Sequence, residues 1–134
     1  MKVEDLGFEL VDGCNLYLAF EIEKSAVYLE RCRTRSSAIF AVDDESVVGV
    51  LCFTVDRHRS LQALGTWVRQ DRRREGLAEL LWSLVLTEYD VRSVVVEAIS
   101  DRGFTLIERL RLKYPAIDWH VSHYGGRALR VLAA

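Results

Sequence analysis

The sequence predicts one mixed α/β (α+β) domain, with a mostly antiparallel sheet of about six to seven strands and about three helices. Short runs rich in β-branched and aromatic residues alternate with turn residues, and two segments have helical periodicity. The 134 residues, half of them apolar, are enough for one packed core and too few for two. No repeat or linker divides the chain. We therefore expect residues 1–134 to form a single domain.

The N-terminal part of the chain is expected to contain a strand and a helix. Residues 7–11 alternate weakly between apolar and polar, as a strand does. Asn15 can cap a following helix over residues 16–32. The apolar face of that helix is imperfect and consists of Leu16, Phe20, Val27 and Leu29.

Three β-rich runs follow and are expected to form an antiparallel meander. They cover residues 38–42, 47–55 and 61–69. Residues 43–46 form an acidic turn between the first two runs, and residues 56–60 turn the chain again. The third run ends at a basic loop.

The helix after this loop has the clearest periodicity in the sequence. Its apolar residues recur at steps of three and four, as one face of a helix requires. They are Leu77, Leu80, Leu81, Leu84 and Val85. We expect this face to pack on the sheet.

The C-terminal part is expected to be a strand, a helix and two last strands. Residues 93–99 are a mostly apolar β run, and Ser100 or Asp101 can cap a helix that ends near Tyr114 and Pro115. Residues 117–122 and 127–132 are the last expected strands, around a turn at His123-Tyr124-Gly125-Gly126.

Composition excludes several classes of function. The net charge of −2 and the pI of about 5.9 argue against general electrostatic binding to nucleic acid. No apolar run is long enough for a membrane span, and the N-terminus lacks the apolar core of a signal peptide, so we expect a cytoplasmic protein. Cys14, Cys32 and Cys52 are widely spaced without a zinc pattern, which favours reduced packing thiols and no metal site.

The most informative segment is the basic loop at residues 68–78, which leaves a strand and enters a helix. A helix start presents unpaired backbone N–H groups and the positive end of the helix dipole. Gly76 permits a close approach of the backbone, and neighbouring arginines add positive charge. Such a junction can hold a pyrophosphate. The alternative is a solvated basic turn at Arg72, Arg73 and Arg74, with Gly76 an ordinary loop glycine.

These residues resemble motif A of the GNAT superfamily of N-acetyltransferases. That motif is Gln or Arg, two residues, Gly, one residue, then Gly or Ala, and it stands here as Arg73-Arg-Glu-Gly76-Leu-Ala78. Val68 supplies the usual hydrophobic residue five places earlier. The element order matches from about residue 38 to 112, while the N-terminal part matches loosely. The resemblance implies the GNAT acyl-CoA N-acyltransferase fold.

The resemblance also implies acetyl-CoA, or another acyl-CoA, as the cofactor. The N–H groups of residues 74–79 would wrap its pyrophosphate, while Arg73 or Arg74 would pair with phosphate oxygens. Residues 66–68 match the strand positions that hold the pantetheine arm and the acetyl carbonyl, where a backbone donor stabilises an oxyanion. The implied cofactor-binding residues are Thr66, Trp67, Val68, Arg73, Arg74, Glu75, Gly76, Leu77, Ala78 and Glu79.

The second half of the family pattern differs in this chain. Many members have an Asn after the fifth strand and, seven residues later, a helical Tyr that protonates the departing thiolate. Ser100 and Ile107 occupy those positions here, and isoleucine cannot give a proton. Three explanations remain open. Another group serves as the acid, the reaction proceeds without a dedicated acid, or the chain binds CoA and does no acyl transfer. Ser100 and Tyr114 are candidate replacement proton donors. The alternative role is a helix N-cap for Ser100 and a packing residue at the helix end for Tyr114.

Glu97 is the candidate general base, since it is the only ionisable side chain in an otherwise apolar strand. It faces either a cleft, where burial would raise its pKa, or solvent. His120, His123 and Tyr124 lie in the last strands, which border the acceptor site in the family. Glu97 and Ser100 are thus the candidate catalytic residues.

The sequence leaves three classes of function. The first is an acyl-CoA-dependent N-acyltransferase, in which a primary amine on a small molecule or a protein attacks the thioester. The second is an inactive GNAT-like binding or assembly module that still binds CoA. The third is a nucleic-acid binder that uses Trp67 and the arginines of the loop, which the acidic chain disfavours. A homodimer is compatible with each class, and no membrane partner is expected.

Overall fold

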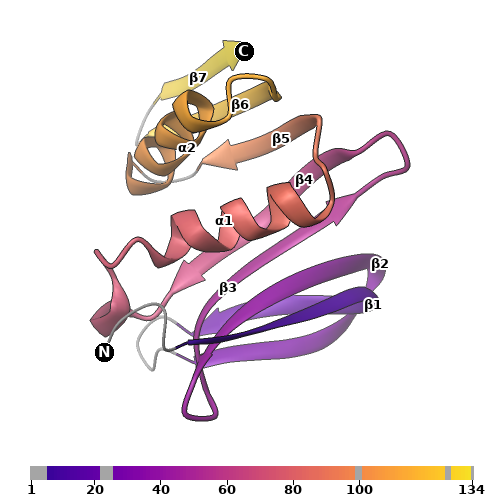
Figure 1. Cartoon of the computed structure of the whole chain (residues 1–134), viewed down its shortest axis with the longest axis vertical. Helices are drawn as coiled ribbons and strands as arrows, with labels where there is room; N and C mark the ends of the chain where they lie inside the picture. Colours follow the sequence, from indigo (N-terminus) through magenta and orange to yellow (C-terminus); the bar gives the residue numbers. More distant parts are fainter. Residues whose placement is uncertain (1–5, 22–25, 99–100, 126–127, 134) are drawn as a thin grey trace. The chain divides into compact units, whose positions relative to one another are not determined.

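The computed structural model describes the backbone of residues 6–21, 26–98, 101–125 and 128–133, and the side chains of residues 6–11, 36–97 and 101–122. Within these residues, seven strands and two α-helices follow in the order β1-β2-β3-β4-α1-β5-α2-β6-β7 (Figure 1). This confirms the predicted mixed α/β class. The chain divides into two compact units, Met1–Thr54 with Leu64–Val85, and Val55–Ala63 with Leu86–Ala134. That these form a single domain stays a prediction.

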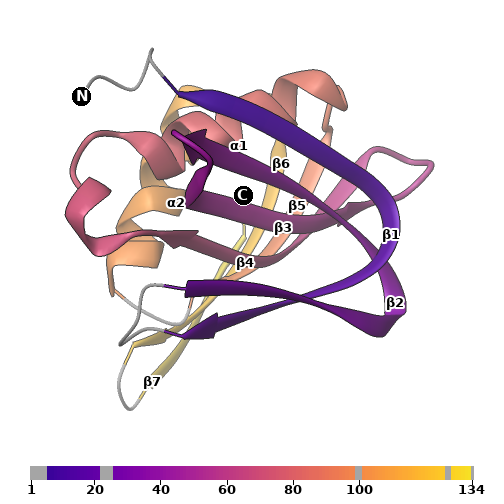
Figure 2. The same cartoon turned by 90° about the horizontal axis from the view of Figure 1, so that it is seen from below.

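The first unit is built on long antiparallel strands. They are β1 (Gly7–Glu21), β2 (Ala26–Asp43), β3 (Ser46–Val55) and the end of β4 (Ser60–Val68), in that spatial order. β1 and β2 pair from Gly7 opposite Val42 to Glu21 opposite Ala26, with irregularities on either side of Cys14. Figure 2 shows this pair as a long, curved ribbon.

The helix predicted over residues 16–32 is wrong, because the described parts of this segment belong to β1 and β2. Residues 16, 18 and 20, and likewise 27 and 29, are apolar at a spacing of two, which suits a strand as well as the predicted helix. The segment also contains Tyr17, Phe20 and Tyr28, and aromatic residues favour strands. The described residues therefore contain one helix fewer than expected.

Strand β3 is the centre of the first unit, since its middle residues are buried on both faces. One face contributes to an apolar cluster made of Ala38, Phe40, Val50, Cys52 and Trp67. Cys52 is buried and forms no disulfide, so its thiol is a packing group, as predicted. The side chains of Cys14 and Cys32 lie outside the described side chains.

Helix α1 (Leu77–Glu88) packs on the other face of β3 through Gly49. A Cβ atom added at Gly49 would lie 3.1 Å from Leu77 Cδ2 and 3.3 Å from Leu81 Cδ1. Leu77 and Leu81 are almost fully buried, as the predicted apolar face requires. The absence of a side chain at Gly49 therefore lets the first turn of α1 lie close to the strand.

The second unit contains a parallel βαβ arrangement. β5 (Ser93–Ala98) pairs in parallel with the start of β4 and with β6 (Asp118–Gly125), and α2 (Asp101–Lys113) connects β5 to β6. β7 (Ala128–Ala133) pairs antiparallel with β6. The expected turn at residues 123–126 starts too early, because His123, Tyr124 and Gly125 are still paired with β7.

The sheet of the second unit has one buried and one exposed face. Val94, Val96, Trp119 and Val121 are buried, and Ile107 and Leu110 are buried on α2, which packs against β5 and β6. Residues Val95, Glu97 and His120 are exposed. This alternation is the one expected of strands that are covered on a single side.

Candidate functional site

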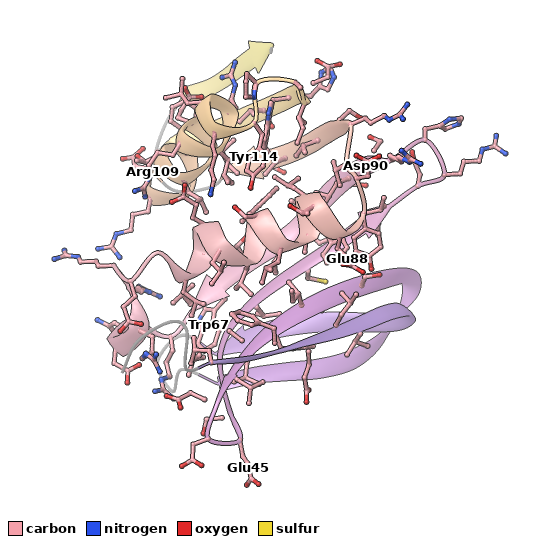
Figure 3. The ribbon with its side chains drawn as sticks, in the orientation of Figure 1. Glu45, Trp67, Glu88, Asp90, Arg109 and Tyr114 are labelled. Carbon is pink, nitrogen blue, oxygen red and sulfur yellow. The ribbon has the colours of Figure 1, made fainter. Side chains whose placement is uncertain are left out.

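The predicted cofactor loop leaves β4 at Val68 and reaches α1 through a short 3-10 helix at Gln70–Arg72. The Arg69 N–H donates to the Val48 carbonyl oxygen at 2.8 Å, which holds the loop entrance to β3. Figure 3 shows Trp67 beside the strands of this unit, where its buried ring belongs to the apolar cluster. The loop therefore starts from a fixed point.

Gly76 forms the junction between loop and helix. Its φ of +77° lies in the left-handed region, where glycine is favoured, and no atom lies within 4 Å of a Cβ built there. The first α1 hydrogen bond runs from the Leu80 N–H to the Gly76 carbonyl oxygen at 3.0 Å. In the described part of the chain, the N–H groups of Leu77, Ala78 and Glu79 have no acceptor. This opening and its free donors fit an anionic phosphate group.

The arginines of the loop differ in what they contact. Arg69 makes a two-pronged contact with Asp71, with Nε 2.6 Å from Oδ1 and Nη2 3.0 Å from Oδ2, and this lowers the pKa of Asp71. Arg73 donates through Nε to the Val68 carbonyl oxygen at 2.9 Å. Arg74 is exposed, has a φ of +67°, and its side chain makes no hydrogen bond or ion pair with a described residue. Arg74 is thus the loop cation with most freedom to meet a phosphate.

Arg72 is different, because it is buried with only 7% of its surface exposed. Its Nη1 lies 2.6 Å from Asp43 Oδ2, at the end of β2, and its Nε lies 3.1 Å from Glu75 Oε2. Burial alone would lower the pKa of Arg72, but the hydrogen bonds to Glu75 and Asp43 outweigh it and raise that pKa. The alternative of a wholly solvated basic turn is therefore wrong for Arg72.

The end of β4 is fixed by a contact from α1. Trp82 is almost fully buried, and its indole Nε1 donates to Thr66 Oγ1 at 3.1 Å. The residues expected along the pantetheine arm, Thr66, Trp67 and Val68, lie at the end of β4. The exposed hydroxyl of Thr66 links this part of the strand to α1. Burial of the Trp67 ring removes the aromatic platform that a nucleic-acid binder would use.

The candidate general base lies in the second unit. Glu97 is exposed on β5 and is paired in register with Ser122 of β6. Ser100 lies outside the described residues. On the neighbouring strand, His120 Nε2 is 3.0 Å from Asp118 Oδ2, with both side chains exposed. The roles of Glu97 and Ser100 stay predictions.

Comparison with known families decides the relationship of the chain. The profile described as "Acetyltransferase (GNAT) family" matches residues 7–99, which is more than half of the sequence. The chain belongs to the GNAT acetyltransferase family. The match includes β4, the loop and the first turn of α1, so the predicted motif lies inside the matched region.

A search of solved structures gave several acetyltransferases. One is a ribosomal-protein-alanine N-acetyltransferase from Brucella melitensis biovar Abortus 2308, with 22% identity and a TM-score of 0.47 over 56% of this chain and 62% of that one. Another is nourseothricin acetyltransferase, with 13% identity and a TM-score of 0.40 over 88% of this chain and 73% of that one.

A third structure is a protein assigned as a streptothricin acetyltransferase from Bacillus anthracis str. Ames, in complex with acetyl coenzyme A. It has 7% identity and a TM-score of 0.39, over 91% of this chain and 65% of that one. The chain thus spans less than two thirds of the first and third of these proteins. A comparison with curated proteins gave no match.

Ile107, which the sequence resemblance predicts at the position of the usual GNAT tyrosine, is part of the protein core. Ile107 on α2 is only 2% exposed, so it packs rather than faces solvent. Tyr114, a candidate replacement acid, is half-buried just after α2, and its carbonyl oxygen accepts a hydrogen bond from Trp119 Nε1 at 3.1 Å. This contact gives the backbone of Tyr114 a structural role.

Sequence reasoning missed two contacts of the site. Asp43 was expected only as the start of a turn, yet it binds Arg72, 29 residues away. The Trp82 to Thr66 hydrogen bond was also not expected. The available signals were an acidic residue where a β-hairpin turns and a tryptophan in an otherwise aliphatic helix, and neither identifies its partner.

Metal ligands and membrane spans were also considered. The described residues contain no group of three or more His, Cys, Asp or Glu side chains placed to hold a metal ion. No helix among them has the length and apolar character needed to cross a membrane.

Proposed function

We propose that the protein is an acyl-CoA-dependent N-acyltransferase that acts on a primary amine. The observation that carries this proposal is the start of α1, where three backbone N–H groups without acceptors follow Gly76 beside the exposed Arg74, in a chain of the GNAT family. A helix start of this kind favours a phosphate group over a neutral ligand. Acetyl-CoA carries a pyrophosphate and an acyl thioester in one molecule.

The residues of the loop would divide the work of holding the cofactor. The N–H groups from Arg74 to Glu79 would face the pyrophosphate, and Arg74 would add a charge-assisted hydrogen bond. Arg73 has committed Nε to Val68, and its terminal nitrogens are the ones available to a phosphate. Thr66, Trp67 and Val68 would follow the pantetheine arm with their backbone groups.

The proposed chemistry is direct acyl transfer. The amine nitrogen forms a bond to the thioester carbonyl carbon, the carbon–sulfur bond breaks, and the products are an amide and the CoA thiol. A base must take one proton from the amine, and we propose Glu97, because its exposed carboxylate is open to an acceptor. Thiolate is a good enough leaving group for the reaction to proceed without the usual tyrosine. A cytoplasmic location and a homodimer stay predictions that accompany this proposal.

Thermal melting with acetyl-CoA tests the binding part of the proposal. Binding to the folded state raises the melting temperature by mass action, so the midpoint should rise as the ligand is added in the millimolar range. An unchanged midpoint at saturating ligand would contradict the proposal.

Release of the CoA thiol in the presence of amines, peptides and aminoglycosides then tests catalysis. Glu97→Gln should bind acetyl-CoA normally and lose turnover, while Glu88→Gln, a change at another exposed glutamate, should keep it. Wild-type turnover in Glu97→Gln would exclude Glu97 as the base.

A further inference from the structure

The side chain of Arg72 links its own loop to the end of β2, which is distant in the sequence, and to the residue just before Gly76. It lies in the short 3-10 helix, and it contacts Asp43 at the end of β2 and Glu75 immediately before Gly76. The side chains of Arg72 and Asp43 are 8% and 15% exposed, so solvent screens their contact weakly. This group is called the Arg72 clamp.

The clamp joins two pieces of backbone that contain residues in the left-handed region. Asp44 and Glu45 form the turn after Asp43 with φ of 48° and 68°, and Arg74 and Gly76 flank Glu75 with φ of 67° and 77°. Residues other than glycine avoid this left-handed region unless surrounding contacts hold them there. Figure 3 shows Glu45 at the outer end of its turn.

Packing alone does not account for a buried arginine at position 72. Burying a charged group is costly, and an apolar residue of similar volume often serves packing as well or better. Arg72 in addition has a buried Nη2 atom without a hydrogen-bond partner among the described residues. The charge is therefore poorly explained by packing alone, whereas the fork of a guanidinium fixes the directions of two carboxylates at once.

We propose that Arg72 is a positioning residue for CoA binding: by clamping Asp43 and Glu75, it holds the backbone of residues 74–76 so that the N–H groups at the start of α1 meet the pyrophosphate. This inference rests on the proposed function. It assigns Arg72 no contact with the cofactor. A loop ordered in advance loses less conformational entropy on binding, so the clamp raises affinity.

The test compares CoA affinity, by titration calorimetry, in variants that change the clamp. Arg72→Met removes the charge and keeps most of the length, and it should weaken CoA binding by about tenfold or more as the loop loses its order. Arg72→Lys keeps the charge without the fork and should show a smaller loss. Arg69→Met, a control that breaks the more exposed pair with Asp71, should keep the wild-type affinity.

A second variant separates positioning from stability. Arg72→Met alone leaves the half-buried carboxylate of Asp43 and the more exposed carboxylate of Glu75 without their cation, and it should lower the melting temperature. The triple variant Arg72→Met/Asp43→Asn/Glu75→Gln removes those charges and should recover much of that temperature, while CoA binding stays about as weak as in Arg72→Met. Hydrogen exchange at residues 74–79 should be fast in both variants.

The outcomes distinguish the two proposals. If the wild type binds CoA and Arg72→Met or the triple variant binds it equally well, the clamp has no positioning role and the function proposed above stands. Recovery of affinity together with stability in the triple variant would also overturn the inference. If the wild type itself does not bind CoA, the proposed function fails and this inference fails with it.

Discussion

The loop between β4 and α1 and the strand β5 are stabilised in different ways. In the loop, Arg69, Arg72 and Arg73 are each held by a side-chain hydrogen bond, and only Arg74 is left without a described partner. On β5, backbone pairing with β6 defines the strand, while Glu97 is exposed. The half of the molecule that would bind the cofactor is therefore preorganised by specific contacts. The half that would supply the base offers an open surface.

The largest effect on stability is expected at Ile107, the predicted position of the family tyrosine. Restoring it with Ile107→Tyr puts a larger, polar side chain into a site that is 2% exposed. Overpacking and burial of the hydroxyl should cost about 2–3 kcal/mol, which lowers the melting temperature by about 5–10 °C. Leu112→Tyr is the control on the same helix, because Leu112 is 83% exposed, and it should melt like the wild type.

The same variant tests the comparison directly. If Ile107→Tyr were as stable as the wild type and released CoA thiol faster, the position would face the reacting groups. The second unit would then carry a prepared chemical site.

A smaller effect is expected under the first turn of α1. Gly49→Val would place side-chain atoms against Leu77 and Leu81, since even a Cβ atom would lie 3.1 Å from Leu77 Cδ2. Overpacking of this kind should lower the free energy of unfolding by about 2 kcal/mol in urea titrations. Gly7→Val is the matched control on β1, where the nearest atom to a Cβ is 3.8 Å away, and it should change stability by less than about 0.5 kcal/mol. Equal losses at both glycines would contradict the close packing of α1 on β3.

Arg74 allows charge and backbone conformation to be separated. Arg74→Gly relieves a residue with φ of +67° and should raise the free energy of unfolding by about 0.5–1 kcal/mol. It also removes a cation, which should weaken CoA binding by about five- to tenfold. Arg74→Ala should lose the same affinity without gaining stability. If Arg74→Gly bound CoA as tightly as the wild type, the unpartnered arginine would have no role in the site.

The smallest effect concerns pH. The Arg69 hydrogen bond lowers the pKa of Asp71 in the folded state, so this carboxylate stabilises the fold above the unfolded pKa of about 3.9. That contribution is lost as the pH falls through the lower folded pKa. The melting temperature of the wild type should therefore exceed that of Asp71→Asn slightly at pH 7, and the two should converge in acid. A difference that grows on acidification would contradict the sign of this pKa shift.

Prediction from sequence was most accurate where local pattern alone decides the structure. The periodicity of Leu77, Leu81 and Val85 gave the buried face of α1, and the turn residues gave the hairpin between β2 and β3. Residues 16–32 failed because their apolar spacing of two permits strands, and pairing with distant residues decided in favour of β1 and β2. The Arg72 clamp was not predictable, because it depends on which carboxylate the fold brings to residue 72.

CoA binding by the loop is the central claim, and titration calorimetry of the wild type against Gly76→Val tests it most directly. The wild type should bind CoA, and a β-branched residue at a φ of +77° should reduce affinity by at least about 100-fold, since it displaces the backbone at the helix start. Gly7→Val should bind like the wild type. Equal affinity in Gly76→Val and the wild type, or no binding by either, would contradict the account.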